Sequence, residues 1–217
     1  MSSPRGSQTV TYRPGKLEFS TTEVRDLLVA WAVLGLAFAI FFAGGGMRFL
    51  QAEPLVLIAA SLLSAGVGFL LHELAHKIVA VRFNQIAEFR ADYSMLFLAL
   101  MSALAGFIFA APGAVYHQGY VTKRQQGLIA LAGPVTNIGL AALFLPFAML
   151  GSGFVAQVGL YGLFINLLLA AFNMIPFGPL DGRTVLDWSK VVFVLVFVPS
   201  LLLTLWLIFP AVFSILG

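Results

Sequence analysis

The chain has 217 residues, of which 60% are hydrophobic and only 10% are charged. Its mean hydropathy of +0.99 is far above that of soluble globular proteins and excludes a protein surrounded by water on all sides. The net charge of +3 comes from so few groups that it indicates loop charges beside an anionic membrane surface rather than nucleic-acid binding. Because the chain has no cysteine, any zinc must be held by His, Asp or Glu.

Six apolar runs follow a polar amino-terminal tail, residues 1–19. Ser20 and Glu23 have the spacing of a capping box, which predicts the start of the first helix. In chain order the runs are 27–43, 55–80, 93–111, 128–150, 153–175 and 191–216. Their lengths are typical of membrane-spanning helices. We therefore predict an all-α polytopic membrane protein, a bundle of five to six transmembrane helices, with a single domain at 20–217 and its core at 55–182.

The distribution of positive charge predicts the topology. If all six runs cross the membrane, the 12 Lys and Arg residues divide 7 to 5 between its two faces. If Tyr93–Val121 instead enters and returns to the same face, as a helix and then a strand, the division is 11 to 1, with Arg48 alone on the far face. Cytoplasmic loops carry an excess of Lys and Arg, which favours the second arrangement. We predict a re-entrant helix-strand segment in a multi-pass protein of the cell membrane, with the amino terminus and the active-site side cytoplasmic.

The second apolar run contains the sequence HELAH at residues 72–76. His72 and His76 are four residues apart, so both imidazoles leave one face of a helix and can bind one metal ion. This is the HExxH zinc signature. The zinc ion would lower the pKa of a bound water, and Glu73 would act as the general base that takes the proton. Ionisable side chains within a membrane span are costly, which favours a functional site over two polar residues at a helix end.

A catalytic zinc ion held by two imidazoles and a water needs one more protein ligand. Most of the nine Asp and Glu residues flank predicted helices or lie in predicted loops. Asp181 instead follows a stretch broken by Pro and Gly at the end of the fifth run. Under the 11-to-1 topology this end faces the same side as the HELAH sequence. We predict Asp181 as the third ligand; the other reading is a turn residue before Gly182.

Four further polar positions have open roles. Asn137 interrupts the fourth run, and Asn166 and Asn173 lie on one face of the fifth. Each could join helices by hydrogen bonds or contact an oxyanion or substrate backbone near zinc. His117 could contact substrate, serve as an alternative ligand, or be a solvated loop residue.

Three motifs in this order resemble the site-2 protease family of intramembrane zinc metalloproteases: HELAH, AGPVTN at 132–137 and NMIPFGPLDG at 173–182. The resemblance implies that His72, His76 and Asp181 hold zinc and that Glu73 is the base. It also implies that Asn173 lies close to the scissile peptide.

The same resemblance implies a strand that pairs with unwound substrate by strand addition, for which Pro112–Val121 is the local candidate. Val115 and His117 in this strand, together with Asn137, are then expected to contact substrate. Backbone that is not helical at membrane depth needs a cavity or protein around it, so this strand should line a polar cavity.

The expected function is that of an intramembrane zinc endopeptidase, in a minimal form without accessory domains, acting on transmembrane protein substrates in the lipid bilayer. The main alternative is a zinc transporter or metal-sensing membrane protein, in which His and Asp would mark an ion path. A metalloprotease that trims prenylated carboxyl termini would need a later Glu as ligand, and no Glu follows Glu88. The sequence does not indicate the oligomeric state or the substrate.

Overall fold

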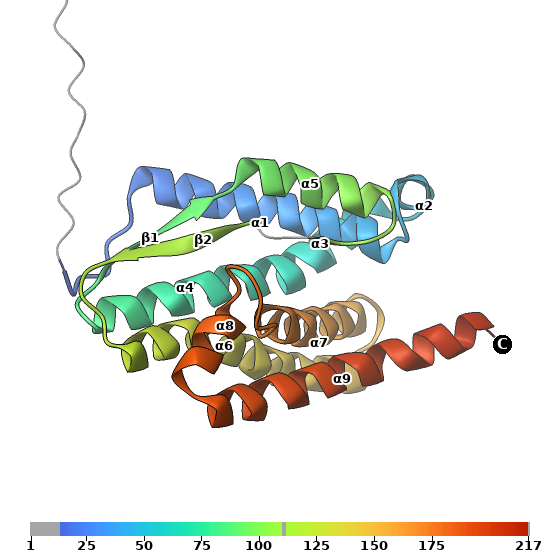
Figure 1. Ribbon diagram of the computed structural model, residues 1–217. Helices are drawn as coiled ribbons and strands as arrows, with labels where there is room; N and C mark the ends of the chain where they lie inside the picture. The colour runs from blue at the N-terminus through green and yellow to red at the C-terminus, as the bar shows by residue number, and fades with distance from the viewer. Residues whose placement is uncertain (1–13, 110–111, 217) are drawn as a thin grey trace, which may run out of the picture.

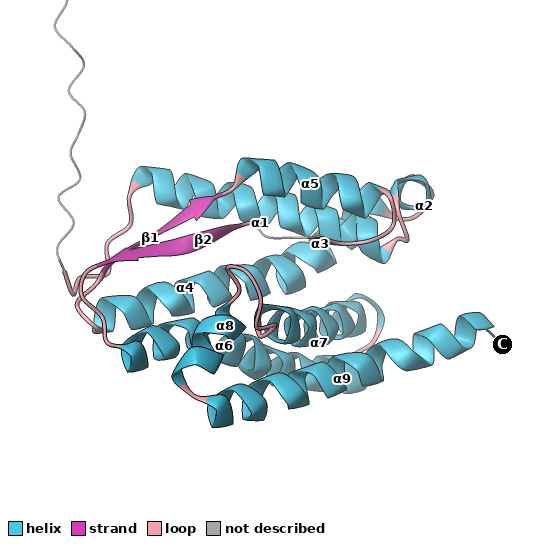
Figure 2. Ribbon diagram, viewed as in Figure 1, coloured by secondary structure: helices cyan, strands magenta, loops and turns pink. Residues whose placement is uncertain are grey.

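The computed structural model describes residues 14–109 and 112–216, so most of the predicted polar tail lies outside the described residues (Figure 1). The elements in chain order are α1 Thr21–Phe42, α2 Gly46–Gln51, α3 Pro54–Ser61, the π-helical turn Leu62–Gly66, α4 Val67–Arg82, β1 Ile86–Ala91, α5 Tyr93–Leu104, β2 Gly113–Gln118, α6 Lys123–Leu150, α7 Gly153–Asn173, α8 Asp181–Trp188 and α9 Lys190–Leu216. Helices therefore dominate, and the two strands form one small sheet among them (Figure 2).

Five helices of the described residues are long and apolar enough to cross a membrane. They are 21–42, 54–82, 123–150, 153–173 and 190–209, where 54–82 joins α3, the π-helical turn and α4. The prediction of an all-α polytopic bundle is confirmed at this level. Helix α5 has only 12 residues, which is about 18 Å of helix and too short for a hydrocarbon core about 30 Å thick. The predicted third run therefore does not form a spanning helix within the described residues, and its positions 110–111 lie outside them.

The strand β1 corrects a prediction, because Glu88 was expected to lie in a loop. Ala87 and Phe89 are buried, whereas the side chains between and after them, Glu88 and Arg90, are only partly covered. This alternation is typical of a strand, but it covers too few residues to stand out in the sequence. Its partner β2 lies beyond α5, so tertiary structure decides the pairing.

The sheet is antiparallel, with Phe89 opposite Val115 and Ala87 opposite His117. The backbone N–H of Phe89 points away from β2, toward α1, where it donates to the Glu23 carboxylate. In an antiparallel ladder such a residue and the one opposite it both direct their backbone groups outward. The N–H and C=O groups of Val115 and His117 therefore point to the outer edge of β2.

The apolar core holds α4, which carries the HELAH sequence, and α8 in place. Phe69 of α4 packs edge-on against Phe89 of β1, with ring centroids 5.7 Å apart. Around α8, Val185 is buried against Met174 and Phe193. These contacts fix the first turn of α8, where Asp181 lies, next to the carboxyl end of α7.

A π-helical turn precedes the HELAH sequence by one to two turns of helix. π-Turns are rare and are frequent at functional sites. Gly66, the last residue of this turn, lies against α1: a Cβ there would be 2.7 Å from the indole of Trp31. The absence of a side chain at Gly66 thus lets this helix lie close to α1.

Candidate metal centre

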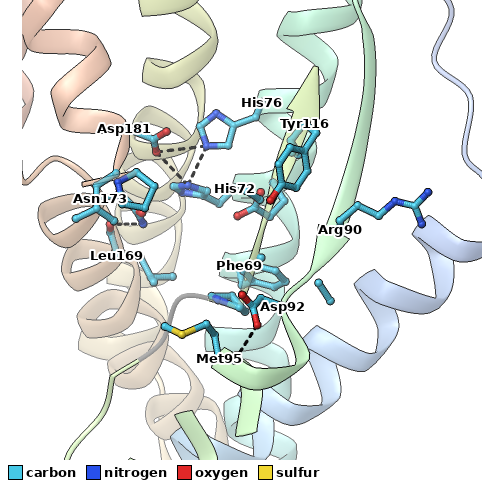
Figure 3. Close-up of a pocket in the computed structure, with 18 of the residues that line it drawn as sticks. Phe69, His72, His76, Arg90, Asp92, Met95, Tyr116, Leu169, Asn173 and Asp181 are labelled. Atoms are coloured by element: carbon cyan, nitrogen blue, oxygen red, sulfur yellow. Dashed lines mark hydrogen bonds and ion pairs between the residues drawn. The ribbon is translucent and has the colours of Figure 1, made fainter. Parts of the chain in front are cut away.

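His72 and His76 leave the same face of α4, and Asp181 reaches them from the first turn of α8 (Figure 3). The two Nε2 atoms are 3.0 Å apart. The Asp181 Oδ2 atom is 3.4 Å from His72 Nε2 and 3.3 Å from His76 Nε2. Among the described residues this is a group of three side chains that could hold one metal ion, and both imidazoles are buried.

The spacing of these three atoms fits zinc. Zinc bonds to His nitrogen and carboxylate oxygen are about 2.0–2.1 Å long, so two ligand atoms on a tetrahedral ion are about 3.3 Å apart. The three measured separations, 3.0, 3.3 and 3.4 Å, are close to that value. Three protein ligands also leave one position open, as catalytic zinc sites do and structural ones do not.

Asp181 is held in the ionised form that a metal ligand needs. Burial alone would favour its neutral acid. The positive field of His76 and the hydrogen bonds from both imidazoles outweigh burial and lower the pKa of Asp181 to about 2. The carboxylate is therefore charged throughout the physiological pH range.

Both imidazoles are oriented through their second nitrogen. His72 Nδ1 is hydrogen-bonded to the Asn137 side-chain oxygen, and His76 Nδ1 lies 2.7 Å from the Ile129 backbone oxygen. Carbonyl oxygens only accept, so each Nδ1 carries a proton, and Nε2 is the nitrogen that can exchange its proton for a metal ion. The α6 helix thus sets the tautomer of both histidines.

A chain of buried amides extends this support to α7. Asn137 donates to the Gly68 backbone oxygen at 3.3 Å and to the Asn166 side-chain oxygen at 2.8 Å. Asn166 in turn donates to the Gly162 oxygen at 2.8 Å. Both asparagines have no exposed surface. Every polar atom at the centre of this chain is paired, as buried amides must be.

Gly133 provides the space for the imidazoles. A Cβ at this position would lie 2.5 Å from His72 Nε2 and 2.5 Å from His76 Nε2. What packs against this glycine is therefore the pair of imidazoles.

A cavity of ≈ 930 Å³ opens beside the three ligands. Glu73 lines it, is 8% exposed, and has no hydrogen bond or ion pair among the described residues. Asn173 also lines the cavity, and its side-chain nitrogen donates to the Leu169 oxygen at 3.0 Å. The cavity wall continues along β2 through Val115 and His117. Burial, and to a smaller extent the positive charge of the nearby His76, lower the pKa of His117 below its ordinary value.

The structure brings most of the predicted site residues to one place. His72, His76, Asp181 and Glu73 lie together at the cavity, with the predicted substrate contacts Asn173, Val115 and His117 around it. Asn137 does not line the cavity: it lies behind His72 and has no exposed surface.

The sequence analysis did not single out the Ile129 carbonyl, because every residue has one, nor the buried pair Glu23 and Lys77. A charged residue next to His76 inside an apolar run was the available signal for that pair.

No family model matches the chain, and no solved structure matches it. Curated relatives do match it. It is 36% identical over 195 residues to a protein of Methanocaldococcus jannaschii named "Putative zinc metalloprotease", covering 88% of this chain and 97% of the relative.

Two bacterial proteins are also similar. "Putative zinc metalloprotease YwhC" of Bacillus subtilis is 32% identical over 64% of this chain and 73% of its own length. "Putative zinc metalloprotease Rip2" of Mycolicibacterium smegmatis is 30% identical over 70% of this chain and 68% of its own length. The donor set formed by His72, His76 and Asp181 fits zinc, and these relatives are named as zinc metalloproteases. The chain therefore belongs to this zinc metalloprotease family, and its cofactor is Zn²⁺.

Proposed function

We propose that the protein is an intramembrane zinc endopeptidase of the site-2 protease type, which hydrolyses peptide bonds in or beside transmembrane segments of membrane proteins. One observation carries the proposal. A cluster of two imidazoles and a carboxylate, spaced for zinc, lies next to Glu73 in a cavity among helices that are long enough to span a membrane, and Glu73 has no hydrogen bond or ion pair among the described residues.

His72, His76 and Asp181 would hold the ion. Bound zinc supplies Lewis-acid activation of a water molecule. Glu73 would take one proton from a water molecule as the oxygen atom of that water bonds to the scissile carbonyl carbon. The same side chain then returns the proton to the leaving nitrogen as the C–N bond breaks. The Glu73 carboxylate, which has no hydrogen bond or ion pair among the residues that the structure describes, is free for both transfers.

Asn173 is the proposed contact to the substrate backbone near the scissile peptide. Its side-chain nitrogen is engaged with Leu169, which leaves the oxygen available to accept from a substrate N–H. For Asn137 the contacts favour hydrogen bonding between helices over the expected contact with substrate. It holds the His72 ring in place and does not line the cavity where substrate would lie.

The outer edge of β2 is the proposed binding edge for substrate. The backbone groups of Val115 and His117 point to this edge, and both residues line the cavity. An unwound substrate segment can add to the edge as a third strand, with main-chain hydrogen bonds. It would then run beside the three ligands.

The spanning helices support a re-entrant segment on the cytoplasmic side. With five crossings, 11 of the 12 Lys and Arg residues fall on the face that carries the metal ligands, and Arg48 alone falls on the other. Helix α5 is too short to cross, so α5 and β2 would enter from that face and return to it. The positive-inside rule makes this face cytoplasmic in a cell membrane.

The test is hydrolysis by purified protein of a panel of transmembrane segments, alongside its zinc content. Glu73→Gln should keep one zinc ion per chain and lose activity by at least roughly 100-fold, the lower end of the range for general-base loss. Glu53→Gln, which changes a carboxylate in the loop before α3, is the matched control and should cleave as the unmodified protein does. Wild-type hydrolysis by a zinc-loaded Glu73→Gln preparation would refute the mechanism.

A further inference from the structure

The inner edge of β1, opposite the one paired with β2, is covered by side chains of α1. Glu23 Oε1 accepts from the Phe89 N–H at 3.0 Å, and Asp26 Oδ2 accepts from the Ala91 N–H at 3.3 Å. Glu23 and Asp26 are three residues apart on one helix face, and they meet N–H groups two residues apart on the strand. The two carboxylates thus occupy the position that a third strand would take.

Glu23 also reaches the metal-bearing helix. Its second carboxylate oxygen forms an ion pair and hydrogen bond with Lys77 Nζ, and Lys77 is the residue directly after the ligand His76. Both side chains are buried, at 0% and 1% exposure. Lys77 Nζ further donates to the Glu18 backbone oxygen at 2.6 Å. One carboxylate therefore joins α1, β1 and α4.

Stability alone does not account for this pair. Removing two charges from water costs about as much as their attraction returns, so a buried ion pair contributes little net free energy compared with apolar side chains of the same size. It does specify geometry, because each partner is strongly destabilised when it is displaced from the other. Here the fixed quantity is the position of β1 relative to α4.

The position of β1 determines the position of β2. The register aligns Phe89 with Val115, so a shift of β1 moves the outer edge of β2 by the same amount. Figure 1 shows the two strands between α1 and α4. The outer edge borders the cavity that the metal ligands also border.

We propose that Glu23, with Lys77, is a positioning residue that holds the substrate-binding edge of β2 at a set distance from the metal ligands. This inference rests on the proposed function for its role in catalysis. The structural part, a clamp between sheet and metal helix, stands independently of whether peptides are hydrolysed.

Two double variants distinguish the loss of the hydrogen-bond acceptor for Phe89 from the loss of the charged pair. Glu23→Leu with Lys77→Met removes the pair and the acceptor for the Phe89 N–H, without leaving a buried charge alone. Glu23→Gln with Lys77→Met removes the pair but keeps a side-chain oxygen for that N–H. Arg82→Met, which removes an exposed charge from the same helix, is the control.

The first readout is amide hydrogen exchange of detergent-solubilised, zinc-loaded protein, which needs no activity. In the Leu/Met variant, residues 86–91 and 113–118 should exchange at least roughly tenfold faster, as expected for a buried N–H that loses its acceptor. Helix α4 and zinc stoichiometry should be unchanged. In the Gln/Met variant, the exchange rates of these two strands should be closer to those of the wild type.

The second readout is how far each variant changes KM and how far it changes kcat, for a transmembrane segment that the unmodified protein cleaves. The Leu/Met variant should raise KM by roughly tenfold or more while kcat changes less, because the edge that binds substrate is displaced and the ligands are not. The Gln/Met variant should recover most of the loss. Wild-type exchange of both strands in the Leu/Met variant would overturn the inference, as would equal effects in the two double variants. If the unmodified protein cleaves no segment, the proposed function fails, and the exchange experiment still decides on the clamp.

Discussion

Gly133→Ala should damage the metal centre through one methyl group. The added Cβ would lie 2.5 Å from His72 Nε2 and His76 Nε2, where ordinary contact begins at 3.4 Å, so the rings must move by about 0.9 Å (3.4 − 2.5). Metal sites tolerate deviations of about 0.2 Å in ligand distance. The rings cannot turn aside freely, because each Nδ1 is hydrogen-bonded, to Asn137 and to the Ile129 oxygen.

We expect zinc affinity to fall on the order of 100-fold, the upper end of the range for outer-shell changes. The assay is competition with a chromophoric chelator in detergent, with helicity followed by circular dichroism. Gly139→Ala on the same helix is the control, since nothing lies within 4 Å of its Cβ position. It should bind zinc normally and gain up to about 1 kcal/mol of helix propensity. Wild-type zinc affinity in Gly133→Ala would refute the geometry of the site.

Three further predictions concern the ligand, the strand edge and the topology. Asp181→Asn should lower zinc affinity by at least roughly tenfold because a neutral amide is a poor ligand; an unchanged dissociation constant would mean that another group completes the site. Val115→Pro removes an N–H on the outer edge and should raise KM at unchanged zinc content, whereas Tyr116→Pro removes a ladder N–H and should destabilise the sheet itself. Equal thermal stability of the two proline variants would contradict this register. Because the chain has no cysteine, Tyr116→Cys and Met47→Cys, both at exposed positions, can be labelled singly: impermeant reagent outside cells should reach position 47 only, and labelling of position 116 from outside would contradict the re-entrant segment.

The capping-box spacing of Ser20 and Glu23 shows where local reasoning succeeds and where it ends. Ser20 caps α1 as predicted, accepting from the Glu23 N–H at 3.0 Å. The Glu23 carboxylate, however, binds Lys77 and the Phe89 N–H. Leaving the buried Lys77 ammonium and the Phe89 N–H without this carboxylate would cost more free energy than leaving the Ser20 backbone N–H without it. Both partners are far from Glu23 in the sequence.

The sequence by itself determined what depends on near neighbours along the chain. The i, i+4 spacing of His72 and His76 places two imidazoles on one helix face whatever surrounds the helix. Long apolar stretches determine helices for a membrane, because the backbone can pair internally only in this way.

Tertiary structure alone decided what depends on residues far apart in the chain. It brings Asp181 within 3.4 Å of His72 and pairs β1 with β2 across α5. It also places Gly133, which has no side chain, against the imidazoles of His72 and His76. These contacts form when helices pack, and their distances are set by the volumes of all the side chains between the helices rather than by any local pattern.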